Sequence, residues 1–114
     1  MNFVKLGSSS IIVQGPRNRT VVSKDAVNFS CTSDKTSDIY WNYIGPQTAD
    51  RTSDVIFDNQ GRNEKSFGER FVTTVNKVTS VLTIHDVLKS DAGTYLCRES
   101  KSNTRWSARL TVTG

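Results

Sequence analysis

The chain has 114 residues, of which 35% are hydrophobic and 23% charged, and its net charge is +4. This length fits one domain with its own hydrophobic core, and the composition excludes disordered and collagen-like chains. No stretch approaches the roughly 20 apolar residues that cross a bilayer, and so modest a positive charge is typical of an ordinary exposed surface.

The first residues carry Lys5 and scattered apolar side chains, without the apolar run of a secretory signal peptide. We therefore expect 1–8 to be an N-terminal extension, or residues added for expression. The folded domain is expected to span 9–114.

Short runs in which apolar and polar residues alternate recur along the chain, and this is the pattern of half-buried β-strands. The expected strands span 9–14 with a continuation at 19–23, then 26–32, 38–44, 54–58, 70–76, 78–85, 93–100 and 105–113. A further short edge strand is considered for 59–69, although its polarity weakens that prediction. Many short strands separated by turn-forming residues predict an all-β sandwich or barrel.

Both cysteines of the chain take the inward parity of their expected strands. Cys31 and Cys97 are free thiols if the protein is cytosolic and form one bridge if it is secreted. Trp41 follows the first cysteine by ten residues on another strand, and Tyr95 precedes the second by two, so that it shares the inward face. The choice between thiols and bridge depends on this arrangement.

Residues 91–97 read Asp-Ala-Gly-Thr-Tyr-Leu-Cys, which matches the Asp-x-Gly-x-Tyr-x-Cys signature of the immunoglobulin superfamily. With the cysteines, the tryptophan and the preceding Leu82-Thr83-Ile84 strand, the chain resembles that family over about 11–113. The resemblance implies an all-β immunoglobulin-like sandwich of two antiparallel sheets joined by one inter-sheet disulfide.

The resemblance also assigns structural roles. It implies a Cys31–Cys97 bridge with Trp41 packed beside it, and a closed loop of 66 residues would stabilise the fold by about 4 kcal/mol in the loop-entropy model. Leu82 and Ile84 belong to the core. The Tyr95 hydroxyl is expected to hydrogen-bond the backbone of the 86–91 turn.

An ion pair is the second structural feature that the resemblance implies. Arg70 stands where variable-type domains have an arginine that pairs with the aspartate equivalent to Asp91. We expect the pair to clamp one end of the sandwich.

The long interval between the cysteines favours the variable type (V-type), in which two extra strands are inserted between the central ones. Residues 45–69 are long enough to hold them, and 55–57 are expected to form the first. An intermediate type without the second inserted strand is the alternative.

The last strand departs from antigen receptors, which carry Phe/Trp-Gly-x-Gly there. Here Trp106 is followed by Ser-Ala-Arg, without a glycine. This difference favours adhesion molecules and innate receptors over rearranging receptors. Trp106 itself takes the inward parity unless the strand bulges.

One outer face of the sandwich is predicted to bind a partner. If the cysteines and Trp41 point inward, alternate residues of strands 38–44, 93–100 and 105–113 point outward. Tyrosine and arginine are frequent interface anchors. The predicted partner-binding residues are Tyr40, Asn42, Ile44, Phe57, Leu96, Arg98, Arg105 and Arg109.

Two glycosylation sequons bear on the choice of face. Asn18-Arg-Thr and Asn28-Phe-Ser fit Asn-x-Ser/Thr. Asn28 alternates with core residues and should face solvent on the opposite sheet. A glycan there would block that sheet and leave the predicted binding face free.

Catalytic chemistry has no candidate residues. His85 is the single histidine and lies beside Asp86 at a strand end, so metal clusters and most triads are excluded. Phosphate-binding glycine loops are absent, and nucleic-acid binding would require more charge and stacked aromatics. We expect no enzyme, metal or cofactor.

The expected function is therefore that of an extracellular binding module from a cell-surface receptor or adhesion molecule. Its partner would be a protein, such as another immunoglobulin domain or a second copy, and any membrane contact would use an anchor outside this chain. The alternative is a secreted innate-immune domain that binds glycans or microbial surfaces through its loops. A purely structural spacer is the third class.

Overall fold

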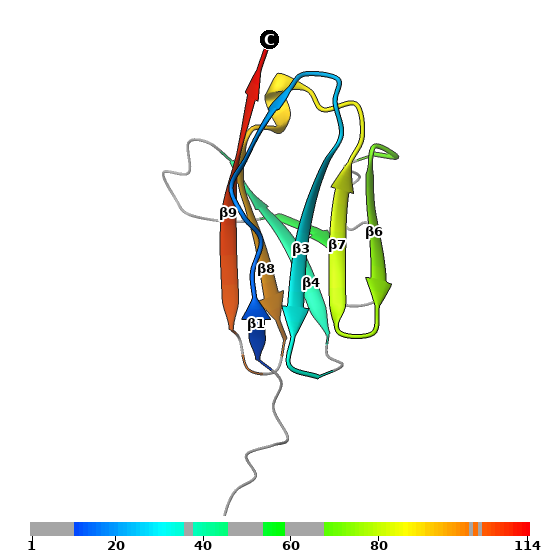
Figure 1. Cartoon of the computed structure of the whole chain (residues 1–114), viewed down its shortest axis with the longest axis vertical. Coiled ribbons are helices and arrows are strands. Elements are labelled where there is room, and N and C mark those ends of the chain that lie inside the picture. The colour runs from blue at the N-terminus through cyan, green and yellow to red at the C-terminus, as the bar shows by residue number, and fades with distance from the viewer. Residues whose placement is uncertain (1–10, 36–37, 46–53, 59–67, 101, 103) are drawn as a thin grey trace, which may run out of the picture.

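The chain folds into two β-sheets packed face to face. The computed structural model describes residues 11–35, 38–45, 54–58, 68–100, 102 and 104–114. Its strands are β1 (Ile12–Gln14), β2 (Arg19–Val22), β3 (Val27–Ser33), β4 (Ile39–Ile44), β5 (Asp54–Phe57), β6 (Phe71–Asn76), β7 (Thr79–Ile84), β8 (Gly93–Glu99) and β9 (Arg105–Thr113), with one 3-10 turn, η2 (Lys89–Asp91). Sheet A has the order β1-β3-β7-β6, and sheet B has the order β2-β9-β8-β4-β5 (Figure 1).

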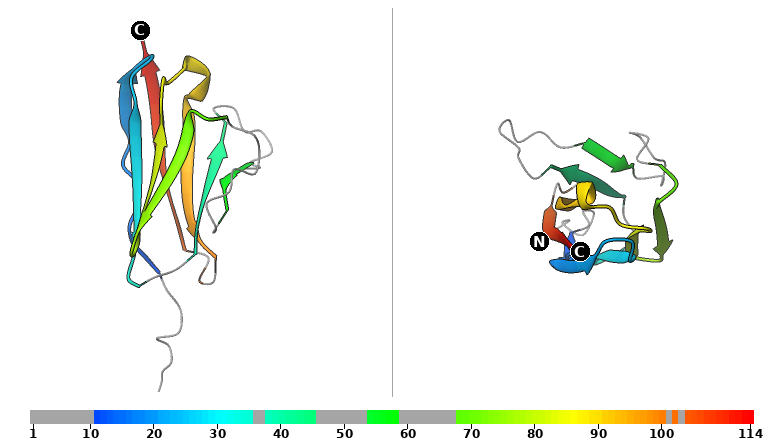
Figure 2. Two further views of the ribbon diagram at one scale, coloured as in Figure 1. Left: turned by 90° about the vertical axis from the view of Figure 1, so that its right-hand side faces the viewer. Right: turned by 90° about the horizontal axis from the view of Figure 1, so that it is seen from above.

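The chain starts in sheet A and then joins sheet B. β1 pairs with β3, whereas β2 pairs with β9, so the segment between them, 15–18, crosses from one layer to the other. The β2–β9 pair is parallel, and the other strand pairs are antiparallel. The view from above shows the two layers of the sandwich (Figure 2).

The expected strands agree closely with the observed ones. From β2 onward each end lies within one residue of the expected position, because alternating apolar residues and turn formers mark those ends well. The first strand begins at Ile12; residues 1–10 lie outside the described part, as does most of the edge strand considered for 59–69. The first inserted strand is β5, which pairs with β4 at the edge of sheet B.

The core lies between the sheets and is centred on a disulfide. Cys31 of β3 and Cys97 of β8 are bonded, so the bridge joins sheet A to sheet B. Trp41 pairs with Cys97 across β4 and β8, is buried, and donates its indole N–H to the Ser80 hydroxyl at 2.9 Å. This bond satisfies the polar atom that burial of a tryptophan brings into the core.

Aromatic rings fill the end of the core near η2. Tyr95 stacks on Phe29 with ring centroids 5.3 Å apart and meets Tyr43 at 5.0 Å. Leu82 and Ile84 of β7 are fully buried beside them. Because buried and less buried residues alternate along β3, β7 and β8, the apolar side chains of these strands lie together between the two sheets.

Candidate partner-binding face

The outer face of sheet B is built from three cross-strand rows. Residues opposite each other in neighbouring strands share a face, and the observed register aligns three triplets across β4, β8 and β9. The tip row, next to the β8–β9 turn, is Tyr40, Arg98 and Arg105; the middle row is Asn42, Leu96 and Ser107; the base row is Ile44, Thr94 and Arg109.

The tip row is organised by a cation–π contact. The Arg98 guanidinium lies over the Tyr40 ring, 4.2 Å from its centroid. Both side chains are partly exposed, and Arg105 next to them is exposed. A ring held flat under an arginine presents a preorganised aromatic and cationic surface.

The middle row is more recessed than the sequence predicted. Asn42 and Leu96 point to the outer face as expected, but they are only 5% and 8% exposed. Both lie on inner strands of sheet B, with a paired strand on each side. The prediction that Leu96 is exposed is therefore wrong. Asn42, predicted as a partner-binding residue, is buried as well, and Ser107 is the exposed member of this row.

Phe57 also departs from its prediction. It lies opposite Trp41 in the β4–β5 pair, where the register shifts between Trp41 and Asn42. Phe57 is 5% exposed and belongs to the core cluster. The side chain thus stabilises the sandwich interior and does not extend the outer face.

The base row borders a hollow of about 570 Å³. Thr94 and Arg109 lie opposite each other at its wall, and Ile44 forms another side. Its described lining residues come from the ends of β4 and β8 and from β9: Ile44, Gly45, Ala92, Gly93, Thr94, Ser107, Arg109, Leu110, Thr111 and Val112. The hollow therefore combines hydroxyl groups, one arginine and one apolar wall.

An ion pair clamps the sandwich at the end near η2. Arg70 Nη1 lies 2.8 Å from Asp91 Oδ2 and Nη2 lies 3.1 Å from Oδ1, a bidentate geometry. The same carboxylate accepts the Leu88 amide at 2.8 Å, and the hydrogen bond to Asp91 raises the pKa of Arg70. This is the pair that the resemblance implied.

Two tyrosine hydroxyls tie β4 and β8 to the same corner. The Tyr95 hydroxyl donates to the Asp91 carbonyl at 2.6 Å, and the Tyr43 hydroxyl donates to the Ala92 carbonyl at 2.7 Å. Burial raises the pKa of both tyrosines, and the nearby Asp91 carboxylate adds to the shift. Gly93 has φ +143°, and a Cβ there would lie 2.9 Å from the Tyr43 hydroxyl, so the signature needs glycine at this position.

Comparison with protein families agrees with this geometry. Residues 14–113 match the family model of the immunoglobulin V-set domain, which is most of the chain. The chain is an immunoglobulin V-set domain. A comparison with curated proteins gives no significant match. V-set domains are in general non-enzymatic binding modules.

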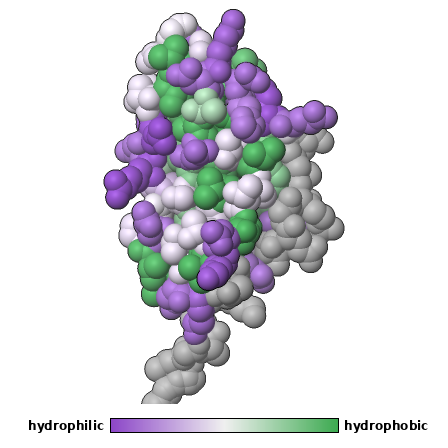
Figure 3. Space-filling view, turned by 45° about the vertical axis from the view of Figure 1, so that its right-hand side comes forward, coloured by the Kyte–Doolittle hydropathy of each residue, from purple (hydrophilic) through white to green (hydrophobic). Residues whose placement is uncertain are grey.

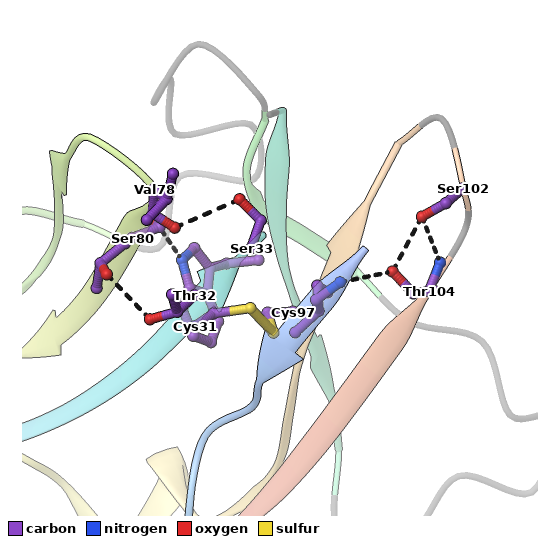
Figure 4. The surroundings of a disulfide bond; sticks show 11 residues. Cys31, Thr32, Ser33, Val78, Ser80, Cys97, Ser102 and Thr104 are labelled. Atoms are coloured by element: carbon purple, nitrogen blue, oxygen red, sulfur yellow. Dashed lines mark hydrogen bonds between the residues drawn. A yellow bond between two sulfur atoms is a disulfide. The ribbon is translucent and has the colours of Figure 1, made fainter. Parts of the chain in front are cut away.

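The β8–β9 turn of this V-set domain is fixed by a buried carboxylate that sequence reasoning missed. Glu99 is fully buried, and its Oε1 accepts the Ser102 amide at 2.6 Å and the Ser102 hydroxyl at 2.9 Å. The Thr104 hydroxyl lies 3.0 Å from that of Ser102 and accepts the Ile12 amide at 3.1 Å (Figure 4). The inward parity of Glu99, shared with Cys97, was the available signal.

Trp106 lies at the edge between the two layers of the V-set domain. It pairs with Cys97 and so takes the inward parity, yet it is 51% exposed. A Cβ built on Gly15 would approach Trp106 Cβ to 2.4 Å, which shows that the crossing segment of the chain lies against the indole. The backbone at Gly15 thus occupies the interior position, and Trp106 packs over it.

Both sequon asparagines are exposed and lie on different parts of the V-set domain. Asn28 faces outward from β3 in sheet A, and its Oδ1 accepts the Thr83 hydroxyl at 2.7 Å. Asn18 flanks sheet B, where its Oδ1 accepts the Arg109 amide at 2.9 Å.

Within the residues that the structure describes, no three His, Cys, Asp or Glu side chains come close enough to hold a metal ion. In the same part, no helix has the length and apolar character that a membrane span requires. His85 is exposed at the end of β7.

Proposed function

We propose that this V-set domain is an extracellular, non-enzymatic binding module of a cell-surface receptor or adhesion molecule. It binds a protein partner through the outer face of sheet B. The observation that carries the proposal is the set of three rows, in which an aromatic ring and three arginines surround a recessed neutral centre. Interfaces are enriched in tyrosine and arginine over a well-packed base.

The disulfide supports the extracellular location. A bond such as Cys31–Cys97 forms and persists in oxidising compartments, and the described cysteines include no free thiol. V-set domains are typically extracellular.

Sheet A is less suited to the role. Its outer positions on β3, β6 and β7 are mostly small and neutral, with Thr32 and Thr79 hydroxyls 2.9 Å apart. On this side hydrophobic spots are small and separated by neutral or hydrophilic side chains (Figure 3). A glycan on Asn28 would cover part of this face, so a partner is expected on sheet B.

The alternative function is a secreted innate-immune domain that binds glycans through its loops. The β8–β9 turn argues against it, since the Ser102 and Thr104 hydroxyls are engaged by Glu99 and by the β1 backbone. Hydroxyls that are already satisfied contribute less to sugar recognition. A glycan array distinguishes the two functions, because an adhesion module gives little signal on it.

A paired substitution tests the binding face. Fluorescent tetramers of the domain are applied to a panel of cells and arrayed ectodomains, and binding of the wild type is compared with that of Tyr40→Ala/Arg98→Glu. We expect binding to fall at least tenfold, while the free energy of unfolding changes by only about 1 kcal/mol through loss of the cation–π contact.

A matched control uses the other sheet. Thr74→Ala/Lys77→Glu alters exposed residues on and beside β6 and reverses one charge. We expect it to leave binding unchanged. Loss of binding in this control, with retention in the sheet B variant, would show that sheet A carries the partner.

A further inference from the structure

The nine positions of the three rows hold cationic and neutral side chains. Of their nine positions, three are arginines and none is acidic. Arg98 is held over Tyr40, whereas the described structure gives the Arg109 guanidinium no ion-pair or hydrogen-bond partner, and its side chain is exposed. Among these nine positions, every formal charge is therefore positive.

This charge pattern disfavours a second copy as the partner. In a two-fold pairing each residue of the face meets a residue of the same face on the copy. Within these rows an arginine of one copy finds arginines or neutral side chains on the other, in whichever register the faces meet. Juxtaposed like charges oppose association.

The base row offers a place for a carboxylate. Arg109 borders the hollow with the hydroxyls of Thr94, Ser107 and Thr111, and Ile44 supplies an apolar wall. The Arg109 main chain is fixed by β8 on one side and by the Asn18 side chain on the other. A guanidinium forms bidentate bonds to a carboxylate, which neighbouring hydroxyls can supplement.

The two ends of the face are separated by a defined distance. Arg105 and Arg109 are four residues apart on β9, which corresponds to about 13 Å along the strand. An opposing strand with acidic residues at positions i and i+4 has the same spacing. The residue at position i+2 of such a strand, midway between the two acidic residues, would face the middle row.

We propose that the sheet B face takes a heterologous protein partner with two acidic side chains about 13 Å apart, one of which docks in the hollow beside Arg109. This inference rests on the proposed function and specifies the chemistry of its partner. The proposed partner is a different protein with an acidic surface, and not a second copy of the chain.

The carboxylate site is tested by NMR titration of the isotope-labelled domain. The probe is N-acetyl-glutamate N-methylamide, and its neutral match is the corresponding glutamine compound, both at constant ionic strength. We expect saturable amide shifts at Thr94, Ser107, Arg109 and Thr111 with the carboxylate, and binding of the neutral match weaker by about tenfold. Arg109→Gln should abolish these shifts, whereas Lys77→Gln, which removes one charge on the far sheet, should preserve them.

The spacing is tested with cyclised β-hairpin peptides that carry two glutamates on one face. We expect a separation of four residues to bind at least about threefold more tightly than a separation of two, because both arginines are then engaged. Sedimentation of the domain alone should show a monomer at rising concentration. A dimer that Arg109→Glu disrupts would overturn the exclusion of a second copy.

Other outcomes overturn the carboxylate site. Equal shifts with the neutral match, or shifts that survive Arg109→Gln, would show that Arg109 does not bind the carboxylate. A methyl glucuronide that binds at least tenfold more tightly than the glutamate probe would assign the site to an acidic glycan. If the titration fails while Tyr40→Ala/Arg98→Glu still weakens tetramer binding, the acidic-partner inference is wrong and the binding face remains.

Discussion

Asp91 is hydrogen-bonded to three other residues at one end of the sandwich. Its carboxylate accepts both nitrogens of the Arg70 fork and the Leu88 amide, and its carbonyl accepts the Tyr95 hydroxyl. Asp91 is 7% exposed, so its charge depends on these donors for stabilisation, whereas the Arg70 side chain is 29% exposed. Loss of any of these donors should therefore lower the stability of the fold, mainly because the buried Asp91 carboxylate loses a partner.

Arg70→Ala is expected to lower the free energy of unfolding by about 2–3 kcal/mol, because it leaves a largely buried carboxylate without its ion pair. Arg70→Lys keeps the charge but lacks the planar fork, and about half of that loss is expected. Urea denaturation measures both. Equal stability of Arg70→Ala and wild type would show that the clamp contributes nothing.

The raised pKa values of Tyr43 and Tyr95 predict loss of stability in alkali. Above the ordinary tyrosine pKa of 10.0, the unfolded chain releases protons that the folded chain retains, so stability is complete below pH 10 and declines above it. The slope approaches about 1.4 kcal/mol per pH unit for a tyrosine that is ionised in the unfolded chain and still protonated in the folded one.

Tyr43→Phe isolates one of these contributions. Urea denaturation between pH 8 and pH 11 should give a shallower decline of the free energy of unfolding above pH 10 for the variant than for wild type. Identical slopes would contradict the assignment of the decline to the buried hydroxyl.

At the scale of elements, the β8–β9 hairpin is held by side-chain hydrogen bonds near its turn. Its strands pair without a register shift from Gly93 opposite Leu110 to Arg98 opposite Arg105, and Glu99 then holds the turn from inside. The Thr104 hydroxyl extends the bracing to β1 (Figure 4). The bonds at Ser102 and Thr104 favour binding by the sheet face over adaptive binding by this turn.

Glu99→Ala should loosen this turn without unfolding the sheets. Hydrogen exchange of the Ser102 and Ile12 amides is expected to accelerate by about tenfold or more, since both lose bonds within one network. Exchange in the middle of β3 and β7 should be unaffected. Glu99→Gln retains an acceptor oxygen and should have a smaller effect, and unchanged exchange at Ser102 in Glu99→Ala would contradict the role of the carboxylate.

The strands were predictable because alternation and turn residues are local signals. The sequence correctly predicted which side chains of β4, β8 and β9 point to the outer face, since their parity follows from the disulfide and Trp41. Phe57 was assigned to the wrong side because a register shift beside Trp41 leaves no local mark in the sequence. The burial of Leu96 and the bonds of Glu99 to the turn residue Ser102 are not specified by parity alone.

At the scale of the whole molecule, the two outer faces differ in kind. Sheet A presents mostly small neutral residues and one sequon asparagine, whereas sheet B presents three arginines around a recessed centre. The second sequon, at Asn18, lies at the β9 side of sheet B, next to Arg109. A glycan there would border the binding face and restrict the approach of a partner from that side.

The central claim is that a partner binds the outer face of sheet B, and added glycans test it most directly. Arg109→Asn creates the sequence Asn-Leu-Thr on β9, and Val81→Asn creates the same tripeptide on the outer face of sheet A. Thr111→Ala added to the first variant removes its sequon and separates the effect of the glycan from that of the lost arginine. Glycan attachment is checked by mass spectrometry of the secreted domains.

Tetramer binding of these secreted variants to the cells and ectodomains recognised by the wild type is the deciding measurement. Glycosylated Arg109→Asn should lose binding completely, its sequon-free version should keep a residual part, and glycosylated Val81→Asn should bind as the wild type does. Retained binding by glycosylated Arg109→Asn, together with loss in Val81→Asn, would contradict the assignment of the partner to sheet B.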